Sequence, residues 1–102
     1  MNMPPSIKVG PHVYSVVRKP SSAMPDYLGY FEPNTLQIWV KQRLRKSKAQ
    51  EILLHEVLHV ASSGLVKNGK DQYDEESFVS ALAPVVLSTL QDNPGLVEYL
   101  TR

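Results

Sequence analysis

The sequence of 102 residues contains no cysteine, and this absence excludes several kinds of site. Disulfide frameworks, iron–sulfur clusters, cysteine-bound zinc and thiol nucleophiles all require cysteine side chains. Any metal ion in this protein must therefore be bound by histidine, aspartate or glutamate.

A strong charge imbalance and long apolar runs are also missing. The formal net charge is +1, so no overall field favours nucleic acid or an anionic membrane. No apolar run approaches the roughly 20 residues that a membrane span needs. The stretch from Met1 to Ser6 lacks the basic and apolar regions of a signal peptide. We therefore expect one cytoplasmic domain over residues 1–102, without a membrane partner.

Residues 7–41 have the pattern of strands and turns. The segments 7–9 and 12–18 are rich in β-branched and aromatic residues, and a Gly-Pro pair separates them. A second pair of segments, 27–32 and 36–40, flanks a Pro-Asn turn, and the alternation around Trp39 is typical of a half-buried strand. These patterns predict a small antiparallel β-sheet.

Residues 47–63 are predicted to form a helix that is buried on all sides. Ser47 and Gln50 fit a capping box, and Gly64 fits the residue that follows a helix C-terminus. Apolar residues cover nearly the whole circumference of the helix, which is typical of a buried one.

Residues 74–100 are predicted to hold two further helices. The first runs from about Asp74, its cap, to Leu90, with a kink or break near Ala83 because Pro84 lies inside it. Asn93 and Pro94 then fit the start of a short terminal helix. With the β-rich segment, the order of elements predicts an α+β fold.

The motif that carries chemistry is His55-Glu56-Val57-Leu58-His59, which is H-E-x-x-H. Positions i and i+4 lie on the same helix face, so both imidazoles can reach one metal ion. Glu56 is rotated by about 100° from His55 and can accept a proton from a water on the metal. Two histidines, a carboxylate and an open position describe catalytic zinc. The alternative is a pair of core histidines bonded to carbonyl groups, with Glu56 at the surface.

A third metal ligand is expected at Glu75 or Glu76, in the first turn of the next helix. Glu75 lies in the middle of the apolar stripe of that helix and should point inward, whereas Glu76 has Ser80 one turn later as a polar support. The choice between them stays open at this point. The apolar stripe is expected to contain Phe78, Val79, Leu82, Val86 and Leu90.

With the acidic pair after it, the HEVLH helix resembles those of the gluzincin metallopeptidases. The whole chain more closely resembles small phage- and prophage-encoded zinc metallopeptidase-like proteins, through its acidic pair, its Ala-Leu-Ala-Pro segment and its Asp-Asn-Pro segment. It is also similar, more distantly, to the minimal zincin domain of the ImmA/IrrE type. The resemblance implies a minimal zincin fold with Zn²⁺ held by His55, His59 and Glu75 or Glu76, and with Glu56 as general base. It implies a peptide or protein substrate in a phage setting.

Residues for the remaining roles are less clearly marked. No residue matches the His or Tyr that stabilises the oxyanion in larger gluzincins, although His12, Tyr30, Tyr73 and Tyr99 are candidates. Trp39 is expected either to line a substrate groove or to pack on Tyr27 or Tyr30.

Five basic residues between Lys41 and Lys48 form a cluster that could contact nucleic acid, although a solvated loop is the commoner explanation. The alternative function is therefore a zincin-like module that binds a protein or nucleic acid without turnover.

Overall fold

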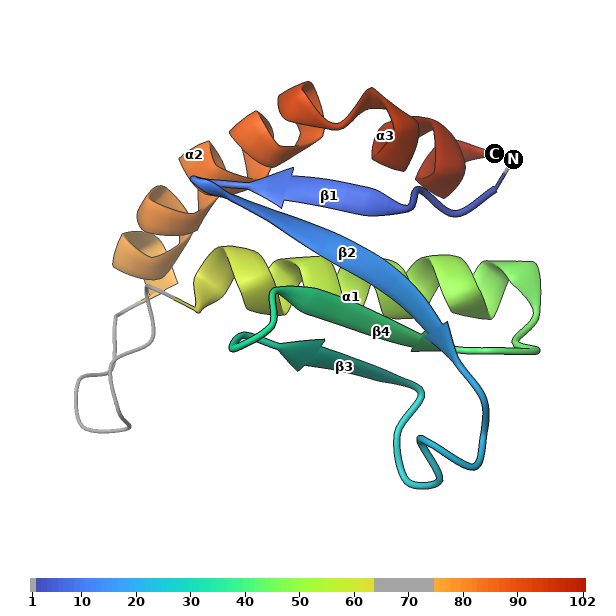
Figure 1. The fold of residues 1–102 in the computed structure, drawn as a ribbon. Helices are drawn as coiled ribbons and strands as arrows, with labels where there is room; N and C mark the ends of the chain where they lie inside the picture. The colour runs from blue at the N-terminus through green and yellow to red at the C-terminus, as the bar shows by residue number, and fades with distance from the viewer. Residues whose placement is uncertain (1, 64–74) are drawn as a thin grey trace.

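The computed structural model describes residues 2–63 and 75–102, apart from the side chains of Glu75 and Glu76. The described part is an α+β fold in which a four-stranded sheet is followed by three helices (Figure 1). The strands are β1 (Ser6–Val9), β2 (His12–Lys19), β3 (Gly29–Glu32) and β4 (Gln37–Lys41). The helices are α1 (Lys46–Ser62), α2 (Glu75–Asp92) and α3 (Pro94–Thr101).

The sheet is mixed, and the prediction of a purely antiparallel sheet is wrong. Its strand order is β1-β2-β4-β3, with antiparallel pairs at both edges and a parallel pair, β2 with β4, in the centre. After β2 the chain crosses to the far edge and forms β3. The β3–β4 hairpin then inserts β4 between β2 and β3, which makes β4 run in the same direction as β2.

The expected pairing of 27–32 with 36–40 is present as the β3–β4 hairpin, and β1 and β2 form a further hairpin. Gly10 has a φ of 59° in the two-residue connection between β1 and β2, a conformation that glycine adopts without strain. The β3–β4 hairpin has a longer turn than expected, because Leu36 has a φ of 54° and β4 begins at Gln37. Leu36 still packs against the core, as the alternation predicts.

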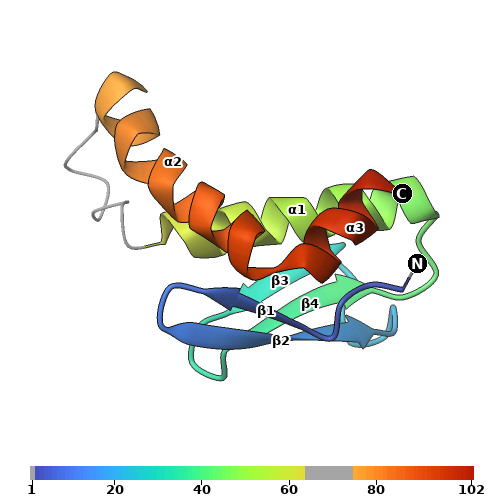
Figure 2. The same cartoon turned by 90° about the horizontal axis from the view of Figure 1, so that it is seen from above.

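All three helices lie on one face of the sheet (Figure 2). The core between these two layers contains Ile7, Val9, Tyr14, Ile38, Val40, Leu53, Val57, Val60, Leu96 and Tyr99. Because only one face is covered, alternate residues of each strand point away from the helices.

Helix α1 is buried on one face only, so the prediction of all-round burial is wrong. Leu53 is fully buried against the sheet, whereas Leu54 and Leu58 are 40% and 39% exposed. The capping box is also wrong: Arg45 is the residue before the helix and makes no side-chain cap bond. Gln50 instead donates from Nε2 to the backbone oxygen of Tyr99 at 2.7 Å.

Helix α2 continues through Pro84 to Asp92. Of the kink or break expected near Ala83, the break is therefore wrong. The predicted apolar stripe is only partly correct, since Val79 and Leu90 are 50% and 37% exposed while Thr89 is buried. Thr89 can be buried because its hydroxyl donates to the Val85 carbonyl one turn earlier, at 2.7 Å. The predicted cap at Asp74 and helix end at Gly64 lie outside the described residues.

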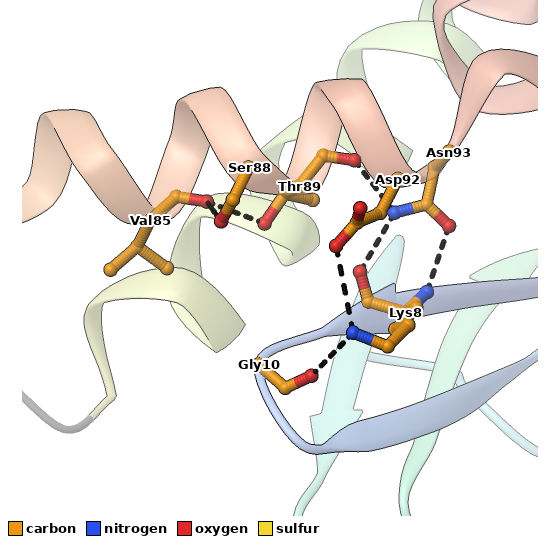
Figure 3. A network of polar contacts seen from close by, with 7 residues as sticks. All are labelled: Lys8, Gly10, Val85, Ser88, Thr89, Asp92 and Asn93. Carbon is orange, nitrogen blue, oxygen red and sulfur yellow. Dashed lines mark hydrogen bonds and ion pairs between the residues drawn. The ribbon is translucent and has the colours of Figure 1, made fainter.

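The α2–α3 junction is fastened to β1 by Asn93 (Figure 3). Helix α3 begins at Pro94 as predicted, but the Asn93 side chain makes no cap bond to it. Its Oδ1 accepts from the Lys8 backbone N–H at 2.8 Å, and its Nδ2 donates to the carbonyls of Lys8 and Thr89, each at 2.7 Å. Within the described ranges, no helix is both long and apolar enough to cross a bilayer.

Candidate active site

The H-E-x-x-H residues lie in the second half of α1, where the helix passes under the edge strand β3. His55 and His59 are exposed, whereas Glu56 between them is only 6% exposed. The Nε2 atoms of the two histidines face each other at 3.0 Å. This arrangement is the reverse of the core-histidine alternative, in which the imidazoles would be buried and Glu56 would face water.

The paired imidazoles fit a transition-metal ion. In a tetrahedral zinc site with Zn–N distances of about 2.0–2.1 Å, two ligating nitrogens lie about 3.3–3.4 Å apart. The observed separation of 3.0 Å between His55 Nε2 and His59 Nε2 is a hydrogen-bond distance, so the two rings need to separate by only a few tenths of an ångström to bind one ion. Neutral imidazole nitrogens are ligands that zinc prefers, so the chemistry of the donor pair fits this metal.

A third ligand is not found among the described side chains. In that part of the chain, no group of three or more His, Asp or Glu residues is close enough to bind one ion. The side chains of Glu75 and Glu76 lie outside the described residues, so the choice between them stays a prediction. Their backbone forms the start of α2, as the sequence predicts.

Glu56 is buried because β3 approaches α1 closely at Gly29. A Cβ atom built on Gly29 would lie 3.0 Å from Glu56 Oε2 and 2.5 Å from Ile52 Cγ2. Burial raises the pKa of the Glu56 carboxyl above its usual value, and electrostatic interactions with His59 and His55 partly counteract this effect. A carboxyl group with a raised pKa holds a proton more readily than an exposed carboxyl group, which suits it to take up and return one.

A cleft of about 660 Å³ opens over these residues. The lining residues come from α1 and its C-terminal end and from the segment around β3: His55, Glu56, His59, Ser62, Ser63, Tyr27, Gly29, Tyr30 and Phe31. The motif residues therefore share one open cavity with the edge of the sheet.

The edge of β3 that borders the cleft has unpaired backbone groups. Among the described strands, β3 pairs only with β4. The Lys41 N–H donates to the Leu28 carbonyl at 2.9 Å, and this fixes the alternation of the ladder. The N–H and C=O groups of Gly29 and Phe31 consequently point away from β4, towards the free edge.

The candidates for an oxyanion donor differ in whether they border the cleft. Tyr30 borders the cleft, but its ring packs on Trp39, on the face of the sheet opposite α1. Tyr99 is a core residue, and His12, at the start of β2, is not among the cleft residues. Tyr73 lies outside the described residues.

The sequence analysis missed five lining residues: Tyr27, Gly29, Phe31, Ser62 and Ser63. Two features of the sequence could have identified three of them, Gly29, Ser62 and Ser63. Positions 62 and 63 follow His55 by seven and eight residues, which places them on the same helix face. A glycine that interrupts an aromatic strand can also indicate a close backbone approach.

Trp39 packs on Tyr30, the cross-strand partner in the register, with ring centroids 5.3 Å apart. The packing alternative is therefore confirmed, and Trp39 does not line the cleft over the histidines.

The basic cluster Lys41–Lys48 lies around the first turn of α1. Lys46 donates to the Arg102 carbonyl at 2.6 Å, and Lys48 pairs with Glu51 at 3.0 Å. From Lys46 to His55 the helix rises about 14 Å, so the cluster is separate from the paired histidines. Contact with nucleic acid stays a prediction.

Comparison with known proteins adds no relative to this description: no family model, curated protein or solved structure matches the chain.

Proposed function

We propose that this protein is a zinc-dependent metallopeptidase of the minimal zincin type, similar to the gluzincins. The observation that carries the proposal is the shared cleft: two imidazole nitrogens 3.0 Å apart lie beside a buried carboxyl group, under a strand edge with free backbone groups. His55 and His59 would hold the metal, together with Glu75 or Glu76.

The proposed reaction is hydrolysis of a peptide bond. Zinc, when bound, lowers the pKa of water towards about 7 and polarises a carbonyl group. Glu56 accepts the proton of the attacking water and then delivers it to the leaving amine. Its buried position beside Gly29 holds the carboxyl group in one place, which favours both proton transfers.

A peptide in extended conformation is the substrate that the free edge of β3 suits best. Its backbone can add to the sheet by hydrogen bonds with Gly29 and Phe31, as in other cases of strand addition. Alternate side chains of the peptide would then enter the cleft over α1. This placement brings a peptide bond next to Glu56.

The test compares three variants of the full chain, each purified and supplied with zinc. Glu56→Gln should keep about one zinc per chain and lose hydrolysis of an unfolded protein substrate. His59→Ala should lose the metal, whereas His12→Ala, the matched control, should keep both metal and activity. Hydrolysis retained in Glu56→Gln would overturn the role of Glu56.

Two further outcomes would replace the proposal. Zinc bound without any hydrolysis would favour a module that only binds a partner, and salt-sensitive binding to DNA would identify that partner as nucleic acid. A chain that binds no zinc when the metal is in excess would remove the site altogether.

A further inference from the structure

A second hollow, of about 420 Å³, lies on the face of the sheet opposite α1. It is lined by Ala23, Met24, Pro25, Asp26, Tyr27, Tyr30, Glu32 and Trp39. Tyr30, Glu32 and Trp39 point to this face because they alternate with core-facing residues along β3 and β4. The hollow shares Tyr27 and Tyr30 with the cleft over the histidines, so the two cavities adjoin across the free edge of β3.

The lining combines three aromatic rings with two carboxyl groups. Tyr30 lies between Tyr27 and Trp39, with ring centroids 6.3 and 5.3 Å away. The carboxyl groups belong to Asp26 and Glu32. Aromatic faces attract cations through the ring quadrupole, and carboxylates attract them through charge. This combination suits an ammonium or guanidinium group.

An ammonium group of the protein itself already lies against this aromatic surface. Lys19 Nζ is 4.5 Å from the centroid of the Trp39 ring, which shows that the ring holds a cation in the folded chain. Lys19 is not a lining residue of the hollow. The charged side chains that line the hollow itself are both carboxylates, and this negative lining favours a cation.

Glu32 is held in a fixed position at the rim. Its Oε1 accepts a hydrogen bond from the backbone N–H of Asn34 at 2.9 Å, in the turn that follows β3. This bond orients the carboxylate without neutralising it, so its charge remains available to a ligand.

We propose that this hollow is a specificity site for a lysine or arginine side chain of the peptide that adds to β3. The proposal rests on the proposed function, since it takes the peptide from that reaction. Successive side chains of a strand point to opposite faces of a sheet. When one side chain enters the cleft over α1, its immediate neighbour in the peptide points to the opposite face, where the hollow is.

Trp39 provides the readout, because it is the single tryptophan of the chain. Its fluorescence is titrated in zinc-loaded Glu56→Gln, which should bind peptide without cleaving it. The probes are hexapeptides in which one arginine is the only charged side chain. Their matched copies carry citrulline in its place, which has nearly the same shape and no charge. We expect the arginine peptides to bind about tenfold more tightly, with the difference shrinking at high salt. Equal affinity for the two peptides would overturn the proposal.

Two variants locate the effect. Glu32→Gln keeps an oxygen that can accept the Asn34 N–H but removes the charge, and it should reduce the preference for arginine to about threefold or less. Asp26→Asn should act in the same direction. Glu98→Gln, an exposed position on α3, is the matched control and should keep the full preference. An unchanged preference in both Glu32→Gln and Asp26→Asn would overturn the assignment.

The experiment separates the two proposals. If the protein hydrolyses arginine and citrulline peptides equally well, the specificity site is wrong and the peptidase proposal stands. If nothing is hydrolysed but the arginine peptides still bind selectively at Trp39, the cation site stands as a binding site without the reaction.

Discussion

The Cα atom of Gly29 lies against the carboxyl group of Glu56, with no side chain between strand β3 and helix α1 at this point. A Cβ atom on Gly29 would be 3.0 Å from Glu56 Oε2, a tight contact, and 2.5 Å from Ile52 Cγ2, which is closer than real Cβ contacts. The edge strand can therefore approach the helix only because residue 29 is glycine. This approach buries the carboxyl group beside the free backbone edge.

Gly29→Ala should destabilise the fold and displace Glu56. The added methyl group overpacks a close contact, a change that costs about 1–3 kcal/mol of unfolding free energy. Denaturant unfolding measures this loss. Gly95→Ala is the matched control: a Cβ on Gly95 meets no atom within 4 Å, and alanine inside α3 should add about 0.5–1 kcal/mol. Equal stability of wild type and Gly29→Ala would show that the two elements can separate without cost.

The sequence was sufficient to predict the elements that depend on local pattern. The α+β order, the β3–β4 hairpin and the start of α3 at Pro94 follow from turn residues and periodicity, and the structure contains them. It was not sufficient for the central pairing of β2 with β4, because a parallel pair depends on where a whole hairpin docks and not on its residues alone.

The H-E-x-x-H motif could be recognised from its spacing, but the burial of Glu56 and the exposure of the two histidines could not be predicted from it. An almost completely apolar helix predicts burial all round, whereas the two-layer fold covers only one face of α1 and leaves both histidines exposed. Nothing in the local sequence states that Glu56 would face Gly29, because 27 positions separate the two residues. Such a contact depends on the tertiary fold.

Asn93→Ala should weaken the attachment of β1 to the helices. The side chain makes three hydrogen bonds, two to Lys8 and one to Thr89 (Figure 3). With a net contribution of about 0.5–1.5 kcal/mol for each bond and partial exposure of the site, we expect a loss of about 2 kcal/mol. Asn34→Ala is the control, since Glu32 bonds to the backbone of residue 34 and not to its side chain. A loss of equal size in both variants would contradict the role of Asn93.

Tyr99→Phe should make the protein more resistant to alkaline pH. Burial raises the pKa of the Tyr99 phenol above its usual value of 10.0, although the charge of Arg18 lowers it in part. Below pH 10 the phenol is protonated in both states, and its full contribution to stability is present. As the pH rises further, the unfolded chain loses the proton first, so stability falls until the folded phenol ionises as well.

The measurement is the free energy of unfolding of wild type and Tyr99→Phe between pH 8 and the highest pH at which both remain folded. The difference between the two should move in favour of Tyr99→Phe above about pH 10. Tyr27→Phe removes a hydroxyl from an exposed side chain and controls for the substitution itself. A constant difference across the range would mean that Tyr99 carries no part of the alkaline transition.

Zinc should stabilise the folded chain through the histidine pair. A ligand at one hundred times its dissociation constant adds about 2.7 kcal/mol if it binds only the folded state. For a domain of this size, each kcal/mol raises the unfolding temperature by about 4–8 °C, so the rise with zinc should be about 10–20 °C. A chelator should reverse it.

His59→Ala should abolish this rise, because one imidazole cannot replace the pair whose Nε2 atoms lie 3.0 Å apart. His12→Ala is the control, since it removes the third histidine of the chain without touching the cleft. Thermal unfolding with and without zinc compares the three proteins and needs no substrate. If zinc raised the unfolding temperature of His59→Ala as much as that of wild type, the metal would be bound elsewhere, and the reaction proposed for the cleft would lose its basis.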